Sequence, residues 1–403
     1  MQQRPTLTRR SALIAGGLAL TGAVAPMPAA AAAPAAEQVD TEPPPPSGER
    51  GITSEPWGAT ADGTAVTRWT LRNHRGTTAR ILTLGGVLQS MLVPDRSGRL
   101  ANVALGFGTL TPYLTNSPNF GAVIGRYANR IANGRFVLDG VTYQLPLNNR
   151  PNTLHGGPVG FARRVWGAAL PFTAPGGLGL RLQYTDPAGE AGFPGTLSAT
   201  VLYTLTEDDA LRIDYHATTD APTVVNLTNH SYWNLAGEGS GDIYDTLLQV
   251  YATRYVPINA SSIPTGGFAP VTDTPFDFTT PRAIGERIRS SDQQLIYGRG
   301  YDHSFDITGG GEGQLVRAAQ ATDPRSGRRL TVWTTEPGVQ LYTGNFLDGT
   351  VLGTGGQAYR QSDGFALETQ HHPDSPNQPA FPSTVLRPGQ TFRSATVYAF
   401  TAV

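Results

Sequence analysis

The sequence of 403 residues contains no cysteine and no lysine, so all thirty of its basic residues are arginines. The absence of cysteine excludes disulfides, thiolate nucleophiles and zinc sites built on cysteine. The absence of lysine removes the reacting residue of Schiff-base catalysis and of P-loop phosphate binding. Any catalysis must therefore use histidine, carboxylates, hydroxyls or a bound metal.

Net charge is almost absent as well. The formal charge is -1 at pH 7, and only 15% of the residues are charged. This balance gives no electrostatic reason to expect nucleic acid or an anionic membrane surface as a partner. Glycine (48) and proline (32) are plentiful, whereas long helical patterns are few. Frequent turns between short segments favour an all-β protein.

The first 36 residues have the character of a targeting segment. The paired Arg9 and Arg10 precede an apolar run from Ala12 to about Val24, and an alanine-rich stretch with A-x-A cleavage options follows. The run is too short and too rich in alanine and glycine for a good transmembrane helix. The arginine pair resembles a twin-arginine export signal, although Ala12 stands where such signals usually carry Phe. An ordinary secretory signal is the alternative. Residues 1–36 are thus predicted to direct export, leaving a secreted protein without a membrane partner after cleavage.

Residues 37–50 form a predicted linker, because four consecutive prolines in this stretch favour an extended, unpacked chain. From residue 51 to residue 403 the composition does not change again, which predicts one large β domain. Its clearest strands are 197–205 and 211–217, where apolar residues occupy the odd positions in the period of two typical of half-buried strands.

An Asp139-Gly140 step suits the positive φ angles of a two-residue hairpin turn, so a hairpin is predicted there. Helical patterns are limited to residues 122–132 and 284–290.

Polar and aromatic residues gather in five clusters, of which residues 224–237 form the densest. The stretch opens with Val224 and Val225, which favour a strand, and then presents Asn, His, Ser, Tyr and Trp side chains within about one strand length. So many hydrogen-bonding groups need partners if they are buried, which favours a strand that enters a polar cleft. The alternative is a loop whose Asn and Ser residues cap turns while Trp233 fills the core.

The other clusters contain further candidates for a site. Arg130, beside Asn129, could hold ligand oxygens with its planar fork, or could form a structural ion pair. His155 precedes two glycines, where a backbone can approach a ligand closely, or could simply bond its own loop. Asp302 places a carboxylate directly before the imidazole of His303 in the sequence. Glu368 follows apolar or small residues at the predicted end of a strand, where a carboxylate needs a partner or a purpose.

Five motifs resemble, in the same order, those of the aldose 1-epimerase (galactose mutarotase) family. They span nearly the whole chain after the linker, and the string Asn-Leu-Thr-Asn-His-Ser-Tyr-Trp-Asn-Leu is the most specific of them. The resemblance implies a large β-sandwich of mostly antiparallel strands, of the galactose mutarotase-like supersandwich type, with a sugar-binding cleft on one sheet face. It also implies interconversion of the α and β anomers of free aldoses such as glucose or galactose. The motifs are Gly125–Ile131, Asn152–Gly157, Asn226–Leu235, Val339–Phe346 and Leu367–Gln370.

The same resemblance implies roles for single residues. His230 would be the general acid and Glu368 the general base, and neither a cofactor nor a metal would be needed. The sequence departs from the family pattern at Ser304, where Asn is commoner, and at His372, where an apolar side chain is commoner. Neither departure belongs to the proton-transfer pair, but both could alter which sugar fits. Contacts to the sugar would come from Asn129, Arg130, His155, Ser231, Tyr232, Asp302 and Gln340.

This reaction suits a paired acid and base. Opening the ring takes a proton from the hydroxyl on C1 and delivers one to the ring oxygen, so both groups must converge on atoms bonded to one carbon. With ordinary pKa values of ~4.3 for Glu and ~6.5 for His, the carboxylate is ready at pH 7 but the imidazole is mostly deprotonated. We expect a nearby carboxylate, either Glu368 or Asp302, to favour the charged form of His230.

Other interpretations stay open on the residues alone. A secreted carbohydrate-binding β-sandwich without turnover would use the same Asn-rich and aromatic cleft. A sugar-active hydrolase or lyase would need two carboxylates about 5–10 Å apart, and Glu368 with Asp302 could supply them. A hexose-6-phosphate epimerase would want a basic cluster, for which Arg163 and Arg164 are the nearest candidates. The preferred aldose and the oligomeric state do not follow from the sequence.

Overall fold

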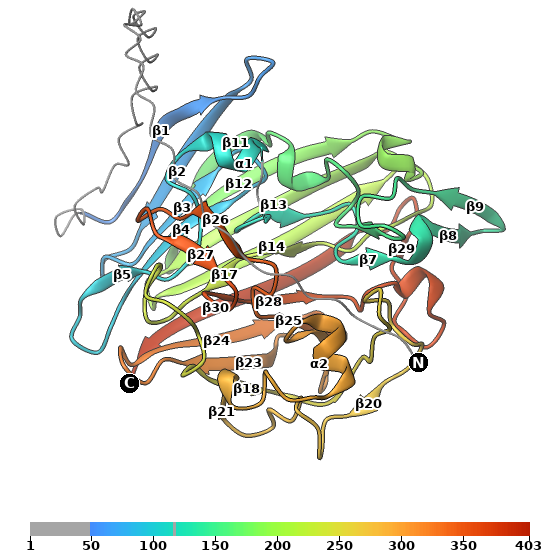
Figure 1. Cartoon of the computed structure of the whole chain (residues 1–403). Coiled ribbons are helices and arrows are strands. Elements are labelled where there is room, and N and C mark those ends of the chain that lie inside the picture. The colour runs from blue at the N-terminus through green and yellow to red at the C-terminus, as the bar shows by residue number, and fades with distance from the viewer. Residues whose placement is uncertain (1–48, 116–117) are drawn as a thin grey trace, which may run out of the picture. The chain divides into compact units, whose positions relative to one another are not determined.

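The computed structural model describes residues 49–115 and 118–403, all of which belong to one compact unit. The predicted export signal at 1–36 and nearly all of the predicted linker at 37–50 lie outside these ranges. The described ranges contain two short α-helices, α1 (Leu110–Thr115) and α2 (Gln293–Gly298), while strands make up most of the remaining regular structure (Figure 1). No helix in these ranges has the length and apolar character needed to cross a membrane.

The largest sheet has nine strands, and its long members run side by side across the molecule (Figure 1). Neighbouring strands pair in antiparallel fashion throughout, and the last strand of the chain lies in the middle of the sheet. In order across the sheet the strands are β11 (Gly167–Ala174), β12 (Gly177–Asp186), β13 (Leu197–Thr206), β14 (Ala210–Thr219), β30 (Phe392–Ala402), β24 (Arg328–Thr334), β23 (Val316–Thr322), β18 (Leu247–Val250) and β21 (Arg282–Ala283).

A second sheet has six strands and packs against the first. The ring of Trp233 lies 5.1 Å from that of Tyr398 and 5.4 Å from that of Phe400, and both of these partners belong to β30. Buried apolar side chains from both sheets form one continuous core, which confirms the predicted all-β sandwich. In order the strands are β17 (Tyr232–Trp233), β28 (Phe365–Gln370), β25 (Gly338–Tyr342), β22 (Asp302–Ile307), β19 (Ala252–Tyr255) and β20 (Ala269–Pro270).

A five-stranded meander and several short ribbons complete the described structure. The meander consists of β1 (Gly51–Ala59), β2 (Ala65–Arg72), β3 (Thr78–Leu82), β4 (Leu88–Pro94) and β5 (Leu100–Asn102). The ribbons pair β6 (Val123–Ile124) with β16 (Thr228–Asn229), β7 (Arg130–Ile131) with β10 (Thr153–Leu154), β8 (Arg135–Leu138) with β9 (Val141–Gln144), β15 (Thr223–Val224) with β29 (Val385–Leu386), and β26 (Asp348–Leu352) with β27 (Ala358–Arg360).

The structure confirms the strands predicted from the period of two. The strands β13 and β14 pair from Leu197 opposite Thr219 to Leu205 opposite Leu211. The odd-numbered residues of both predicted segments are buried, as the pattern requires. The hairpin predicted at Asp139-Gly140 joins β8 to β9, with φ angles of 52° and 78° at these two residues.

The helix predicted at residues 122–132 is wrong. The segment contains β6 and β7 instead, and its apolar side chains pack from an extended backbone. Gly125 lies so close to Phe161 that a Cβ atom there would be 2.4 Å from the ring, a spacing that favours glycine in a closely packed extended segment. The second predicted helix, at 284–290, is reduced to one 3-10 turn at Ile284–Glu286. Short apolar runs cannot by themselves distinguish a buried strand from a helix.

Candidate active site

Glu368 lies on strand β28, and the alternation of side chains along this strand points it away from the core. Its neighbours Leu367 and Thr369 face the nine-stranded sheet, where Tyr398 Oη donates to the carbonyl of Leu367 at 3.3 Å and the hydroxyls of Thr369 and Thr396 bond at 2.5 Å. Successive side chains of a strand point to opposite faces. Glu368 therefore points to the other face of the six-stranded sheet, where it lines an open hollow.

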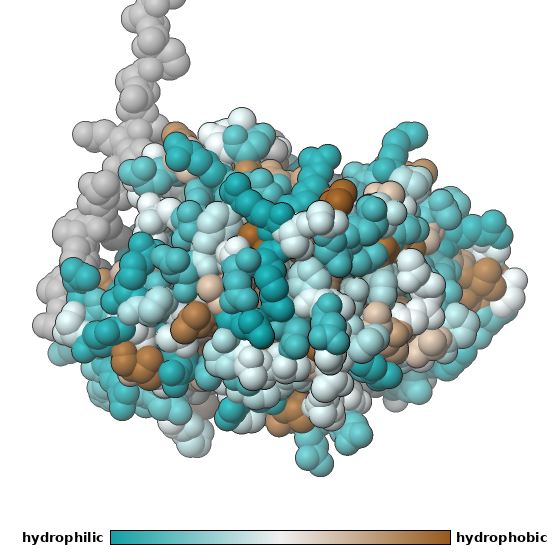
Figure 2. All heavy atoms as spheres, turned by 60° about the horizontal axis from the view of Figure 1, so that its bottom comes forward, coloured by the Kyte–Doolittle hydropathy of each residue, from teal (hydrophilic) through white to brown (hydrophobic). Residues whose placement is uncertain are grey.

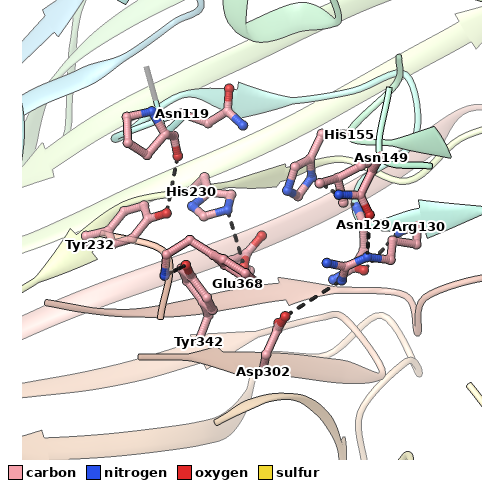
Figure 3. A pocket seen from close by; sticks show the side chains of 13 residues that line it. Asn119, Asn129, Arg130, Asn149, His155, His230, Tyr232, Asp302, Tyr342 and Glu368 are labelled. Carbon is pink, nitrogen blue, oxygen red and sulfur yellow. Dashed lines mark hydrogen bonds and ion pairs between the residues drawn. The ribbon is translucent and has the colours of Figure 1, made fainter. Parts of the chain in front are cut away.

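His230 is held above Glu368 by its backbone and by its ring. Its N–H donates to the carbonyl of Ala122 at 2.9 Å, and its carbonyl accepts from the N–H of Gly121 at 2.9 Å. Its ring stacks on that of Tyr232, with the centroids 5.0 Å apart. As a result, His230 Nε2 lies 3.6 Å from Glu368 Oε1 (Figure 3). Two residues far apart in the sequence thus form one pair of titratable groups.

Seven of the nine predicted site residues line this hollow, whose volume is about 740 Å³ including the part open to solvent. Figure 3 shows their side chains converging from both of its walls. The seven residues are Asn129, Arg130, His155, His230, Tyr232, Asp302 and Glu368.

The remaining two predicted site residues, Ser231 and Gln340, do not line the hollow. Ser231 Oγ donates to Asn229 Oδ1 at 2.5 Å and is buried behind His230. Gln340 is buried as well, and its Nε2 donates to Asp302 Oδ1 at 2.7 Å. Ser231 Oγ and Gln340 Nε2 are thus bonded to neighbouring residues of the site wall, and direct contact of these two side chains with the sugar stays a prediction.

Arg130 and Asp302 face each other across the hollow. Arg130 Nη1 lies 3.7 Å from Asp302 Oδ2, and Arg130 Nε donates to Asn149 Oδ1 at 3.1 Å. Burial raises the pKa of Asp302, while the Arg130 guanidinium and the Gln340 amide act in the opposite direction. A guanidinium beside a carboxylate offers fixed donors and acceptors, which is a suitable arrangement for neighbouring hydroxyl groups.

His155 is fixed in one neutral tautomer. The backbone N–H of Asn129 donates to His155 Nδ1 at 3.2 Å, so the ring carries its hydrogen on Nε2 when it is neutral. Burial keeps the pKa of His155 well below its usual value, and the nearby His230 and Arg130 lower it further. The following Gly156 approaches the backbone of Gly125, since a Cβ there would lie 2.1 Å from the Gly125 carbonyl oxygen. The glycines after His155 thus permit close backbone packing inside the protein.

The protonation of the central pair differs from the sequence-based expectation. Burial lowers the pKa of His230 to about 4, which means that the desolvation of the imidazolium outweighs any help from a carboxylate. Burial also raises the pKa of Glu368 well above its usual value, and the negative charge of Asp302 adds to this rise. The empty site therefore favours a neutral imidazole beside a carboxylic acid. This neutral pair and the ion pair contain the same single proton.

The same residues offer ligand atoms for a metal. One atom each of His155, His230 and Glu368 lies within 4.8 Å of the others, and two histidines with a glutamate are a known donor set for zinc. A metal on Nε2 of His155 would require its hydrogen to move to Nδ1, which already accepts the N–H of Asn129. The tautomer of His155 therefore suits hydrogen bonding to a ligand better than it suits metal coordination.

Sequence reasoning missed several residues of the hollow. Tyr342 lines the site and follows Gln340 by two positions, so the period of two on β25 could have placed it on the same face. Phe346 and Asn149 also line the hollow and lie within or beside recognised motifs. Leu154 lies within the motif Asn152–Gly157, whereas Pro118 and Asn119 lie outside the five motifs and are brought in by the fold.

A β-sandwich whose sheet face carries a buried imidazole–carboxyl pair beside an arginine–aspartate pair has the arrangement of an enzyme that transforms a small polar ligand by proton transfer. The family model for aldose 1-epimerase matches residues 67–399, and the chain belongs to that family. It is an isomerase of the mutarotase class.

Individual relatives agree with this assignment. The chain is 43% identical to the galactose mutarotase of Rattus norvegicus over 338 residues, which cover 84% of this chain and 95% of that protein. It is 39% identical to the aldose 1-epimerase of Escherichia coli (strain K12) over 343 residues, which cover 85% and 97% of the two chains.

Solved structures share the fold. The aldose epimerase homologue from C. elegans superimposes with a TM-score of 0.75 at 32% identity, covering 83% of this chain and 98% of that one. The galactose 1-epimerase from Lactobacillus acidophilus gives a TM-score of 0.77 at 28% identity, covering 88% and 99%.

Proposed function

We propose that the protein interconverts the α and β anomers of free aldoses such as glucose or galactose, with His230 and Glu368 as the proton-transfer pair. The observation that carries this proposal is the distance of 3.6 Å between His230 Nε2 and Glu368 Oε1 at the base of an open hollow. Further support comes from Glu368 Oε2 and His230 Nδ1, which have no hydrogen-bond partner among the described residues. Arg130, His155 and Asp302 would bind the sugar hydroxyls.

In the ring-opening step, Glu368 as carboxylate removes the proton of the hydroxyl on C1. The C1–O5 bond breaks while His230 as imidazolium delivers a proton to the ring oxygen O5, and C1 becomes the carbonyl carbon of the open-chain aldehyde. Each positioned proton transfer typically contributes about 10²–10⁴ in rate. At this stage Glu368 holds a proton and His230 is neutral.

Rotation about the C1–C2 bond then presents the other face of the carbonyl. During reclosure O5 attacks C1, O5 loses its proton to His230, and the carbonyl oxygen takes a proton from Glu368. The second anomer leaves the starting pair restored. The neutral pair that burial favours is the state in which the enzyme holds the open-chain sugar. Burial would therefore lower the free energy of the intermediate relative to the ion-paired states on either side of it.

Polarimetry of freshly dissolved α-D-glucose and α-D-galactose tests the proposal. We expect the purified protein to accelerate the approach to the equilibrium rotation well above the buffer rate, with no release of reducing ends from an oligosaccharide. An unchanged rotation curve would leave a carbohydrate-binding module, and release of reducing ends would favour a hydrolase. The site gives no support to a phosphorylated substrate, because Arg163 and Arg164 do not line the hollow and Arg164 pairs with Glu190.

We further propose that the protein is exported. The proposal is supported by the sequence of residues 1–36, in which Arg9 and Arg10 precede an apolar run and A-x-A cleavage options. Expression of the full chain in a bacterium with twin-arginine export should yield a shortened protein outside the cytoplasm, with a new N-terminus near residue 36 by mass spectrometry. Replacing both arginines by lysine should retain it inside. Export that is unaffected by this change would indicate an ordinary secretory signal.

A further inference from the structure

The two positions at which the sequence departs from the family pattern contact each other. Ser304 Oγ lies 2.9 Å from His372 Nδ1, and neither side chain lines the hollow of the active site. Both are buried, and the His372 ring is enclosed by the rings of Phe268 and Phe381, each with its centroid 5.1 Å away. Any influence of these two positions on which sugar fits would therefore be indirect, through the residues that do line the hollow.

The contact spans three strands. Ser304 lies on β22 and His372 follows the end of β28, while β25 runs between these strands. The ring of His372 passes over Gly338 of β25, where a Cβ atom would lie 2.9 Å from both Cε1 and Nδ1 of the ring. A side chain at position 338 would thus push the imidazole away from Ser304. Because Gly338 has no side chain, there is room above it for the hydrogen bond between Ser304 and His372, the Ser304–His372 bridge.

A third residue, Asp306, lies near the other ring nitrogen of His372. Its Nε2 lies 3.6 Å from Asp306 Oδ1, and Asp306 in turn accepts from Arg254 Nε at 3.0 Å near the surface. The separation of 3.6 Å is too long for a hydrogen bond, but a carboxylate on that side favours the tautomer with the hydrogen on Nε2, in which Nδ1 accepts from the hydroxyl of Ser304. The Ser–His–Asp order resembles a hydrolytic triad, but Ser304 is only 2% exposed and does not line the hollow of the active site.

The bridge adjoins the residues that bind and transform the sugar. Ser304 is paired with Gln340 across β22 and β25, and Gln340 is paired with Glu368 across β25 and β28, so the three form one row on the same face. Gln340 also donates to Asp302, which lies two residues before Ser304 on β22. The strand that carries Asp302 and the strand that carries Glu368 are thus tied together beside the hollow.

We propose that His372 and Ser304 are positioning residues for the sugar: their hydrogen bond over Gly338 fixes the spacing between Asp302, which binds sugar hydroxyls, and Glu368, the general base. The inference rests on the proposed function. Losing the bond would let β22 shift relative to β28, and small displacements of binding groups in a preorganised site weaken substrate binding. Because the proton-transfer pair itself lies on β28 and the His230 loop, KM should change more than kcat.

The test measures KM and kcat for D-galactose by polarimetry in a double-mutant cycle. For Ser304→Ala and for His372→Phe, which keeps a ring of similar size, we expect KM to rise by about fivefold, the worth of one net hydrogen bond, while kcat stays within about twofold. The double variant should be no worse than His372→Phe alone. His372→Asn, whose side-chain oxygen can still accept from Ser304, should stay near the wild-type KM.

Thermal unfolding curves would show that each variant is folded at the assay temperature, and Ser304→Ala removes only one hydroxyl oxygen. A wild-type KM in both single variants, KM increases that multiply in the double variant, or a kcat that falls as much as KM rises would overturn the proposed bridge. These outcomes presuppose an active wild-type protein. A wild-type protein without mutarotation would instead refute the proposed function.

Discussion

The rate of anomer interconversion should follow a bell-shaped pH dependence, whose acid limb belongs to His230 and whose alkaline limb belongs to Glu368. The reaction requires one proton on the pair. Burial lowers the pKa of His230 to about 4 and raises that of Glu368 well above its usual value. As the pH falls below about 4, the second proton binds and no base remains. As the pH rises through the elevated pKa of Glu368, the last proton leaves and no acid remains.

The assay is kcat/KM for α-D-galactose by polarimetry over a range of pH, with the buffer-catalysed rate subtracted at each point. At one pH unit below the acid midpoint we expect about a tenth of the plateau rate, since one protonation removes activity. A return to neutral pH before measurement controls for acid unfolding. The residual rate of Glu368→Gln should still change with pH around a midpoint near 4, because only His230 then titrates. A midpoint near 6.5 in that variant would refute the claim that burial governs the pKa of His230.

Three further predictions concern binding, stability and metal. Asp302→Ala should raise KM by about tenfold or more and change kcat no more than KM, because a charged hydrogen-bond acceptor is lost. The control Asp348→Ala, at an exposed position, should leave both constants unchanged. An unchanged KM in Asp302→Ala would contradict the assignment of Asp302 to sugar binding. Arg126→Met should lower the free energy of unfolding by about 3–5 kcal/mol in urea denaturation, because Asp186 would stay buried without the partner that now lies 2.8 Å away. Its control is Arg387→Met, whose ion pair with Asp139 is about half exposed and whose loss should change the free energy of unfolding far less; equal losses would refute the argument from burial. Treatment with EDTA should leave mutarotation unchanged, and loss of activity that returns with a divalent metal would show that the pair does not act alone.

Local patterns allowed the framework of the fold to be predicted from the sequence. Alternating apolar residues identified β13 and β14, because a strand with one buried face leaves a period of two in the chain. The Asp139-Gly140 step identified a hairpin, because its backbone angles favour these residue types. The helix predicted at 122–132 was wrong, since the apolar residues of a densely packed, irregular segment have no period that distinguishes them from a helical face.

The composition of the site was also largely predictable, because its residues lie in long motifs. The motifs could not indicate how deeply each side chain is buried or which partner it contacts. Ser231 and Gln340 lie beside residues that line the hollow, yet both are turned to partners within the wall. The pKa of His230 was expected to rise beside a carboxylate, but it falls because the folded chain removes the imidazole from water. Burial and distance depend on segments that are far apart in the sequence, so a local pattern does not record them.

The contact between Ser304 and His372 also depends on segments that are far apart in the sequence. Both residues were recognisable as departures from the family pattern, but their meaning depended on a glycine in a third strand. A change of sugar specificity was a reasonable interpretation of each position alone. That interpretation stays a prediction, and the mutual contact of the two buried side chains supports the proposed role in holding two strands together.

The central claim is that His230 and Glu368 carry one proton between them. They use it to move protons to and from the two oxygens that are bonded to C1 of the sugar. The most direct test compares Glu368→Gln and His230→Asn with the exposed controls Glu312→Gln and His74→Asn, using polarimetry for kcat and calorimetry for galactose binding. We expect each of the first two variants to lose about 10²–10⁴ in kcat while still binding galactose, and both controls to match the wild-type protein. Mutarotation at the wild-type rate by Glu368→Gln would contradict the claim.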